Sequence, residues 1–226
     1  MNPDFVVLAN KHYLLDKDFY VKPLVKTVEL KLKKDGSVKT PGIRMAVNSK
    51  MKLQEDCWNA LVAMSDAAWA DGYKLFLKSA YRSWQTQNTM YKNRLKKNNG
   101  KDDGWVSMAG ASDHQTGLGC DVVPSNWTDR GMNEKMMKEP ECQWMAEHCQ
   151  EYGFIIRYPA DKKEFTEINT EPWHLRYVGI PAATYIMENG LCLEEFHEQL
   201  QAAISEYLAK GGDPERVEGF VQKSTD

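Results

Sequence analysis

The sequence predicts a single α+β domain. Strand-like and helix-like segments interleave along the chain without the regular spacing of βαβ units, and we find no internal repeat and no stretch with the composition of a linker. A chain of 226 residues is also long enough to bury a core. We expect residues 1–210 to form the domain and the polar residues 211–226 to form a C-terminal tail that frays.

The first half of the chain predicts a helix, a strand and a second helix. The first helix is expected from Asn48 to Gly72, with Asn48 or Ser49 as its cap, because apolar side chains recur every three or four residues on one face. Residues 73–82 alternate and are rich in aromatic and aliphatic side chains, which is typical of a strand. The second helix is expected from Ser83 to Gly100.

The second half begins with a loop over residues 100–117, which is rich in glycine and small polar residues. Short apolar runs then indicate three strands, at 118–123, 154–158 and 171–179. Capping residues and helical periodicity indicate three helices, at 140–152, 181–189 and 193–210.

The composition limits the classes of protein to which this chain can belong. Hydrophobic residues make up 42% and charged residues 27%, as in ordinary globular proteins, and the formal net charge of -3 gives no reason to expect nucleic acid as a partner. No apolar run approaches the roughly 18 residues of a membrane span, and the first residues lack the apolar core of a signal peptide. We expect a cytoplasmic protein as the chain is written, or a secreted or anchored one if a signal was removed.

The five cysteines include no Cys-x-x-Cys pair, which argues against a disulfide framework and against a cysteine-rich zinc module. Cys142 and Cys149 fall in a predicted helix and are expected to be buried thiols.

Three stretches concentrate residues with chemical capability, at 79–87, 112–121 and 171–179. A catalytic zinc site needs three protein ligands, and His114, Asp121 and His174 supply two imidazoles and a carboxylate. Gly117 and Gly119 would let the chain fold back so that the first two converge. Spacing alone leaves open the alternative of a histidine and a carboxylate that merely share a loop.

Glu171 is the candidate base, three residues before His174. Positions i and i+3 of a regular strand face opposite sides, so the strand must twist or bulge for Glu171 to reach a metal on His174. The simpler alternatives are an exposed glutamate here and a surface salt bridge for Arg82. His12, His148 and His197 are read as surface or satisfied core histidines.

The motifs "SAYRSWQTQ", "SDHQTGLGCD" and "EPWHLRYVG" resemble those of zinc D-alanyl-D-alanine carboxypeptidases and dipeptidases of the VanY, VanX and VanXY types. Related L,D-carboxypeptidases belong to the same broad group, as do lysostaphin-type peptidases and hedgehog domains. The resemblance covers residues 5 to about 200. Ala80 stands where glycine is usual, and Gly119 where alanine is usual.

The resemblance implies a small, mainly antiparallel sheet with flanking helices, as in hedgehog and D-Ala-D-Ala peptidase domains. It implies Zn²⁺ as the cofactor and a peptidoglycan stem peptide or free D-Ala-D-Ala as the partner. The implied roles are as follows: His114, Asp121 and His174 as ligands, Glu171 as catalytic base, Arg82 as oxyanion donor, and Ser112, Gln87, Tyr81 and Trp173 as substrate-binding residues.

The implied function is a D,D-carboxypeptidase, with D,D-dipeptidase activity as an addition. The alternatives are an L,D-carboxypeptidase acting on tetrapeptide stems and a zinc-containing binding module without activity. Glu171 and Arg82 favour an enzyme over a binding module. Residues 96–111 and 125–140 are expected to frame the pocket.

Overall fold

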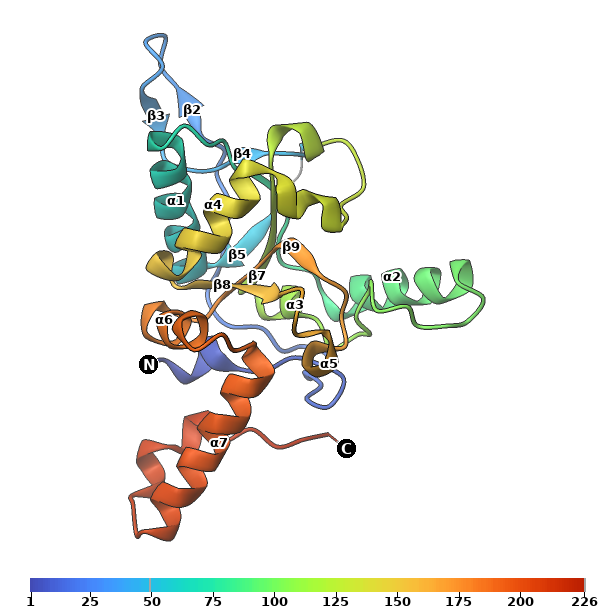
Figure 1. The fold of residues 1–226 in the computed structure, drawn as a ribbon, viewed down its shortest axis with the longest axis vertical. Coiled ribbons are helices and arrows are strands. Elements are labelled where there is room, and N and C mark those ends of the chain that lie inside the picture. The colour runs from blue at the N-terminus through green and yellow to red at the C-terminus, as the bar shows by residue number, and fades with distance from the viewer. Residues whose placement is uncertain (49, 226) are drawn as a thin grey trace.

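In the computed structural model, which describes residues 1–48 and 50–225, a five-stranded sheet of order β4-β6-β7-β9-β8 lies at the centre (Figure 1). β4 and β6 pair in parallel, and the other neighbouring strands are antiparallel. The strands are β4 Arg44–Met45, β6 Phe76–Ser79, β7 Gly119–Val123, β9 Glu171–Tyr177 and β8 Phe154–Tyr158.

Two antiparallel ribbons lie outside this sheet. β1 (Leu24–Lys26) pairs with β5 (Lys52–Gln54), and β2 (Lys31–Leu32) pairs with β3 (Val38–Thr40). The second ribbon projects from the body of the molecule (Figure 1). Neither ribbon is predicted by the sequence pattern, because each strand has only two or three residues.

Seven α-helices are present in the described residues, and two of them, α1 and α4, pack with the sheet strands in the larger hydrophobic core. α2 projects from the body, and α7 extends away from it on the side opposite the β2-β3 ribbon (Figure 1). The helices are α1 Glu55–Ala70, α2 Trp84–Lys97, α3 Asp113–Thr116, α4 Pro140–His148, α5 Lys163–Thr166, α6 Ile180–Glu188 and α7 Leu193–Ala209.

The predicted α+β architecture with a mainly antiparallel sheet is confirmed, and most elements lie close to their expected positions. The apolar face of α1 is confirmed too, since Cys57, Leu61, Met64 and Ala68 are fully buried. The start of α1 at Asn48 was wrong. Residues 52–54 are used as β5, and the Gln54 side chain caps the helix by accepting from the Cys57 amide. Ser49, the other predicted cap, lies outside the described residues.

The C-terminal tail is more ordered than expected. The Gln222 side chain donates to the Leu8 carbonyl and accepts from the Leu8 amide, at 2.7 and 2.8 Å. The Thr225 amide donates to the His12 carbonyl at 2.8 Å. These bonds to the backbone of the N-terminal segment, which periodicity cannot reveal, dock the tail.

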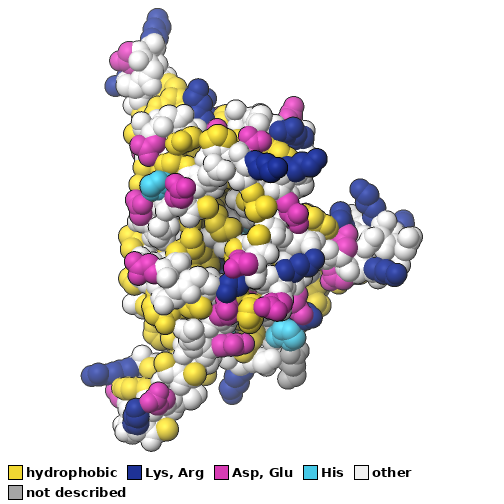
Figure 2. Space-filling model, in the orientation of Figure 1, with side chains coloured by type: hydrophobic (Ala, Val, Ile, Leu, Met, Phe, Trp, Pro, Cys, Tyr) yellow, Lys and Arg dark blue, Asp and Glu magenta, His cyan; other side chains and the backbone are white. Residues whose placement is uncertain are grey.

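On the face drawn in Figure 2, acidic and basic side chains are interspersed, with a group of basic residues toward the far end of α2. None of the helices formed by the described residues combines the length and the apolar character that crossing a bilayer requires.

Candidate metal centre

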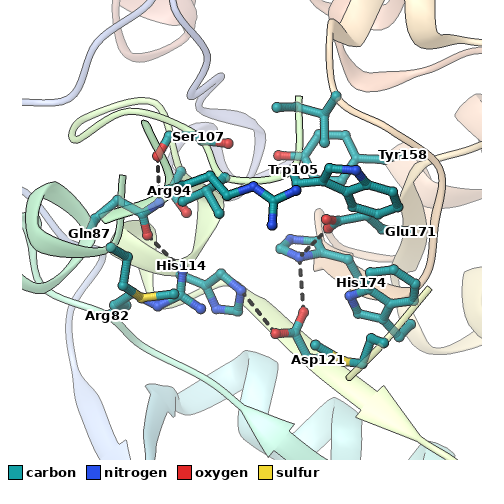
Figure 3. Close-up of a pocket in the computed structure, with 16 residues that line it drawn as sticks. Arg82, Gln87, Arg94, Trp105, Ser107, His114, Asp121, Tyr158, Glu171 and His174 are labelled. Carbon is teal, nitrogen blue, oxygen red and sulfur yellow. Dashed lines mark hydrogen bonds and ion pairs between the residues drawn. The ribbon is translucent and has the colours of Figure 1, made fainter. Parts of the chain in front are cut away.

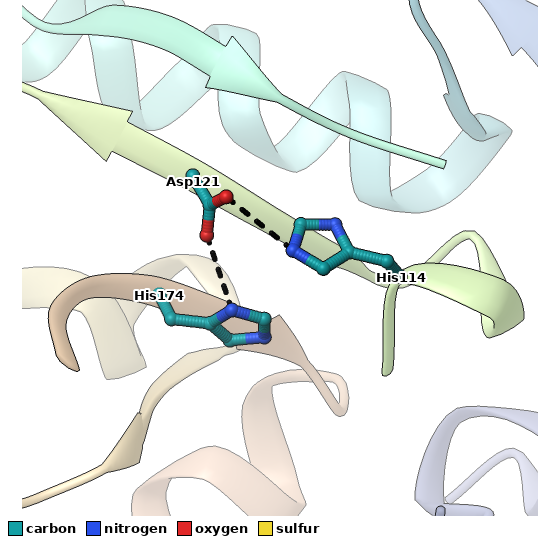
Figure 4. A group of neighbouring side chains, drawn as sticks. All are labelled: His114, Asp121 and His174. Atoms are coloured by element: carbon teal, nitrogen blue, oxygen red, sulfur yellow. Dashed lines mark ion pairs between the residues drawn. The ribbon is translucent and has the colours of Figure 1, made fainter. Parts of the chain in front are cut away.

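His114, Asp121 and His174 come together in the structure from three different elements (Figure 4). Asp121 on β7 lies directly opposite His174 on β9 in the antiparallel register, so both side chains share one face of the sheet. His114 approaches from α3. Nε2 of His114 is 3.4 Å from Asp121 Oδ2, and Nδ1 of His174 is 3.1 Å from Asp121 Oδ1.

Two glycines between His114 and Asp121 allow the chain to reverse its direction within a few residues. Gly117 ends α3 with φ of 81°, in the left-handed region that favours glycine. A Cβ on Gly119 would lie 2.9 Å from the backbone carbon of Asp113, so glycine lets α3 pack closely on β7. The sequence interpretation of this turn is therefore supported by the backbone.

The environment of His114 fits a cation between the ligands. Nδ1 of His114 lies 2.7 Å from the Ala80 carbonyl oxygen, which can only accept, so the ring proton is on Nδ1. When this buried ring is neutral, its bare Nε2 lone pair faces the Asp121 carboxylate. A bound metal ion removes this unfavourable contact between two acceptors, and the carbonyl keeps the ring oriented.

Electrostatics leave His114 and Asp121 in the forms that a metal requires. Burial lowers the pKa of His114, and nearby Arg82 lowers it further, so the imidazole is neutral. Asp121 is ionised, since its pKa lies below the usual range even though burial alone would raise it. Two imidazoles and one carboxylate form a donor set suited to Zn²⁺.

Glu171 reaches this group because β9 bulges. Ile156 pairs with Leu175, but Tyr158 pairs with Glu171, so β9 carries two more residues than β8 between these pairs. The bulge brings Glu171 Oε2 to 3.6 Å from His174 Nδ1, the nitrogen that faces Asp121. Burial and the charge of Asp121 raise the pKa of Glu171 well above its usual range, and Arg82 opposes them.

Arg82 is held in a fixed position beside the same residues. Its Nη1 donates to Gln87 Oε1 at 2.6 Å, and its Nη2 donates to Ser79 Oγ at 3.1 Å. Its backbone amide donates to the His114 carbonyl, which ties the arginine to α3. The guanidinium therefore lies on a rigid support and faces the cavity that contains the metal group.

The cavity has a volume of about 420 Å³ (Figure 3). It is lined by eight of the nine predicted site residues, and Trp105, Ser107 and Met132 come from the two segments that were expected to frame it. Tyr81, the ninth, is not among the described lining residues. Its ring instead lies 6.0 Å from that of Tyr20.

Sequence reasoning missed several residues of the site. Arg94, Trp105 and Tyr158 also line the cavity. Behind it, fully buried Asp113 is paired with Arg157 and Arg176, and neither arginine is exposed to solvent. The available signal was an arginine inside each of two apolar strands, "FIIRY" and "WHLRY", where a charge needs a buried partner.

Cys120, which directly precedes Asp121 on β7, packs in the hydrophobic core rather than in the cavity. Burial raises the pKa of its thiol well above the ordinary value, so the thiolate is disfavoured. All five cysteines are buried and free.

Comparisons with known proteins agree with this geometry. The family model described as "VanY: D-alanyl-D-alanine carboxypeptidase" matches residues 50–180. The putative carboxypeptidase YodJ of Bacillus subtilis (strain 168) is 34% identical, over 88% of this chain and 70% of YodJ.

Two solved structures are also similar. The LdcB LD-carboxypeptidase superposes with a TM-score of 0.74 at 33% identity, covering 87% of each chain. A variant of the vancomycin resistance D,D-pentapeptidase VanY in complex with Zn(II) gives a TM-score of 0.61 at 28% identity, covering 85% of this chain and 98% of the other.

The fold and the His-Asp-His group together define a zinc metallopeptidase. More narrowly, the chain belongs to the VanY family of D-alanyl-D-alanine carboxypeptidases.

Proposed function

We propose that the protein is a zinc D,D-carboxypeptidase that releases the terminal D-alanine from peptidoglycan stem peptides. The observation that carries the proposal is the position of Glu171, whose Oε2 lies 3.6 Å from Nδ1 of His174. A buried carboxylate at this place can reach a water that attacks a carbonyl beside the metal group.

His114, Asp121 and His174 are the proposed ligands. A zinc ion held by them would polarise the scissile carbonyl and lower the pKa of water toward neutrality. Glu171 takes the proton from the attacking water and later delivers a proton to the leaving amino group of D-alanine. Its raised pKa suits this exchange, because a base that also serves as an acid works best near the operating pH.

Arg82 is the proposed donor to the oxygen that becomes negative during the attack. Gln87 and Ser79 fix its guanidinium, so little reorganisation is needed as charge develops. A donor aimed in this way contributes on the order of 3 kcal/mol to the transition state.

The remaining assignments concern substrate binding. Ser112 lines the cavity, and no hydrogen bond from its side chain caps α3, so its hydroxyl is proposed to bind the terminal carboxylate. Trp173 is proposed to form a wall of the cavity, and Gln87 to act through Arg82. Tyr81 lies outside the cavity, and we leave it out of the proposed substrate-binding set.

The test is D-alanine release by the zinc-loaded protein from three substrates. They are free D-Ala-D-Ala, a pentapeptide stem ending in D-Ala-D-Ala, and a tetrapeptide stem with an L-residue before its terminal D-Ala. Release from the pentapeptide is expected, and added release from the dipeptide would indicate a bifunctional enzyme. Cleavage of the dipeptide or of a cytosolic precursor would suit a cytoplasmic enzyme, and cleavage of assembled wall a secreted one.

The second candidate is an L,D-carboxypeptidase, which is favoured by the similarity to the LdcB structure. Release from the tetrapeptide alone would establish it in place of the D,D-activity. Zinc binding without release from any substrate would instead support a binding module.

A further inference from the structure

The cavity continues well beyond the metal group, along one face of α2. Gln87, Met90 and Arg94 line it and are spaced as neighbours on a single helical face. Gln87 contacts Arg82 at the inner end. Arg94 lies seven residues further along the helix, which corresponds to about 10 Å of helical rise. The cavity therefore has an inner end at the metal group and an outer end at Arg94.

The loop on the other side of the outer end is rigidly anchored. Arg94 donates from Nε and Nη2 to the Asp103 carboxylate, at 3.0 and 2.6 Å. Asn169 binds the same loop twice, by donating to the Asp103 and Gly104 carbonyls. These bonds hold Trp105, whose ring stacks on Trp173 with an interplanar angle of 10° and centroids 6.4 Å apart.

At the outer end of the cavity, the guanidinium of Arg94 does not use all of its hydrogen-bond donors. Nη1 of Arg94 has no hydrogen-bond partner among the residues that the structure describes, and the side chain is 33% exposed. In Figure 3 its guanidinium lies between Gln87 and Trp105. Asp103 does not line the cavity, and the other charged residues of the described lining belong to the metal end. A substrate that reaches Arg94 therefore meets a positive group with free N–H donors.

We propose that Arg94 and Trp105 form an outer subsite that binds a carboxylate on the peptide substrate, on the amino side of the scissile bond. This rests on the proposed function, because a carboxypeptidase removes one residue and the rest of its substrate extends on the amino side. At about 3.3 Å per residue, 10 Å places the carboxylate roughly three residues from the cleaved bond. Trp105 and Trp173 provide the wall along which the intervening residues lie.

The test uses matched pairs of acetylated tetrapeptides ending in D-Ala-D-Ala, with glutamate or glutamine at the first or the second position. For the zinc-loaded protein, kcat/KM is expected to favour glutamate about tenfold in one of the two registers, since a charge-assisted hydrogen bond contributes on the order of a factor of ten or more. Arg94→Gln should bring the glutamate-to-glutamine ratio to about one. Arg94→Lys should keep part of it.

Two further variants separate charge from loop anchoring. Asp103→Asn weakens the anchor but keeps the cation, so rates on both peptides should fall while their ratio stays at the wild-type value or rises. Lys97→Gln removes an exposed cation from the same helix, outside the cavity, and should leave the ratio unchanged. Zinc content and melting temperature are measured for every variant.

Equal rates on the glutamate and glutamine peptides in both registers, by an otherwise active wild type, would overturn the subsite and leave the proposed function intact. An equal loss on both peptides in Arg94→Gln would also overturn it, since that is the result of a purely structural role. Absence of release from every peptide would contradict the proposed function. In that case, equilibrium binding of the same peptides tests whether the subsite exists. A glutamate-to-glutamine affinity ratio near one would reject it.

Discussion

At the scale of single residues, the proposed role of Glu171 as a base differs from that of the three proposed metal ligands. Glu171→Gln keeps the shape of the side chain but removes its ability to take a proton, so D-alanine release should fall by about 10²–10⁴ while zinc binding is retained. His174→Ala is the matched contrast, because it should lose zinc as well as activity. D-alanine release and zinc content after dialysis measure the two effects. A Glu171→Gln enzyme with most of its activity would remove Glu171 from the role of base.

A second residue-scale prediction concerns pH. The base must be ionised, so kcat/KM falls as pH decreases through the pKa of Glu171. Burial and Asp121 raise this pKa, whereas Arg82 lowers it. Arg82→Gln should therefore move the acidic limb of the pH profile to higher pH, besides lowering the plateau by about 10² through loss of the oxyanion donor.

The pH profile of D-alanine release by the zinc-loaded variant and wild type checks this. An acidic limb that stays in place, or moves to lower pH, would show that Arg82 does not influence the ionisation of the base.

At the scale of elements, the close packing of α3 on β7 fixes His114 relative to Asp121. Gly119 occupies a position where the resemblance leads one to expect alanine, but here a Cβ would meet the backbone and Cβ of Asp113 at 2.9 Å. The two elements would have to separate, and so would the two proposed ligands.

Gly119→Ala is therefore expected to destabilise the protein by about 1–3 kcal/mol and to weaken zinc binding, although it restores the usual residue. Gly131→Ala is the control, because a Cβ there meets nothing within 4 Å. Urea unfolding and zinc titration measure the two effects. A stabilised Gly119→Ala variant with unchanged zinc affinity would show that α3 shifts without consequence.

At the scale of the whole molecule, the buried ion pairs and hydrogen bonds of two arginines connect the metal centre to the N-terminal segment and to α7. Arg157 binds Glu194 of α7 through two hydrogen bonds of 2.7 and 2.8 Å, and also binds Asp113, the neighbour of His114. Arg176 binds Asp113 and donates to the carbonyls of Phe5 and Val7. Segments outside the family match of residues 50–180 thus support the metal centre.

Glu194→Gln should lower the free energy of unfolding by about 3 kcal/mol, since removing one partner leaves a buried arginine only partly compensated. It should also weaken zinc binding, because Arg157 would then hold Asp113 less firmly. Glu198→Gln, an exposed position on the same helix, is the control and should change stability by less than about 0.5 kcal/mol. Loss of stability with unchanged zinc affinity would limit the network to a structural role.

The sequence by itself determined the fold class, most helices and strands, and eight of the residues that line the cavity around the metal group. These follow from local signals. Apolar periodicity places the buried face of α1, and chemically capable residues cluster in three short motifs. The requirement that the strand twist or bulge at Glu171 was also derived from the sequence, because alternation along a strand is a local rule.

Only the tertiary structure decided how these pieces meet. The register that sets Asp121 opposite His174 depends on pairing between residues that are more than fifty positions apart in the sequence. The sequence does not show whether an arginine is buried or exposed. The roles of Arg157 and Arg176 are therefore seen only in the structure, where Asp113 and Glu194 pair with them. The same holds for Arg94 and Trp105, and for the docked tail. Each depends on contacts between distant segments, and local propensity does not encode such contacts.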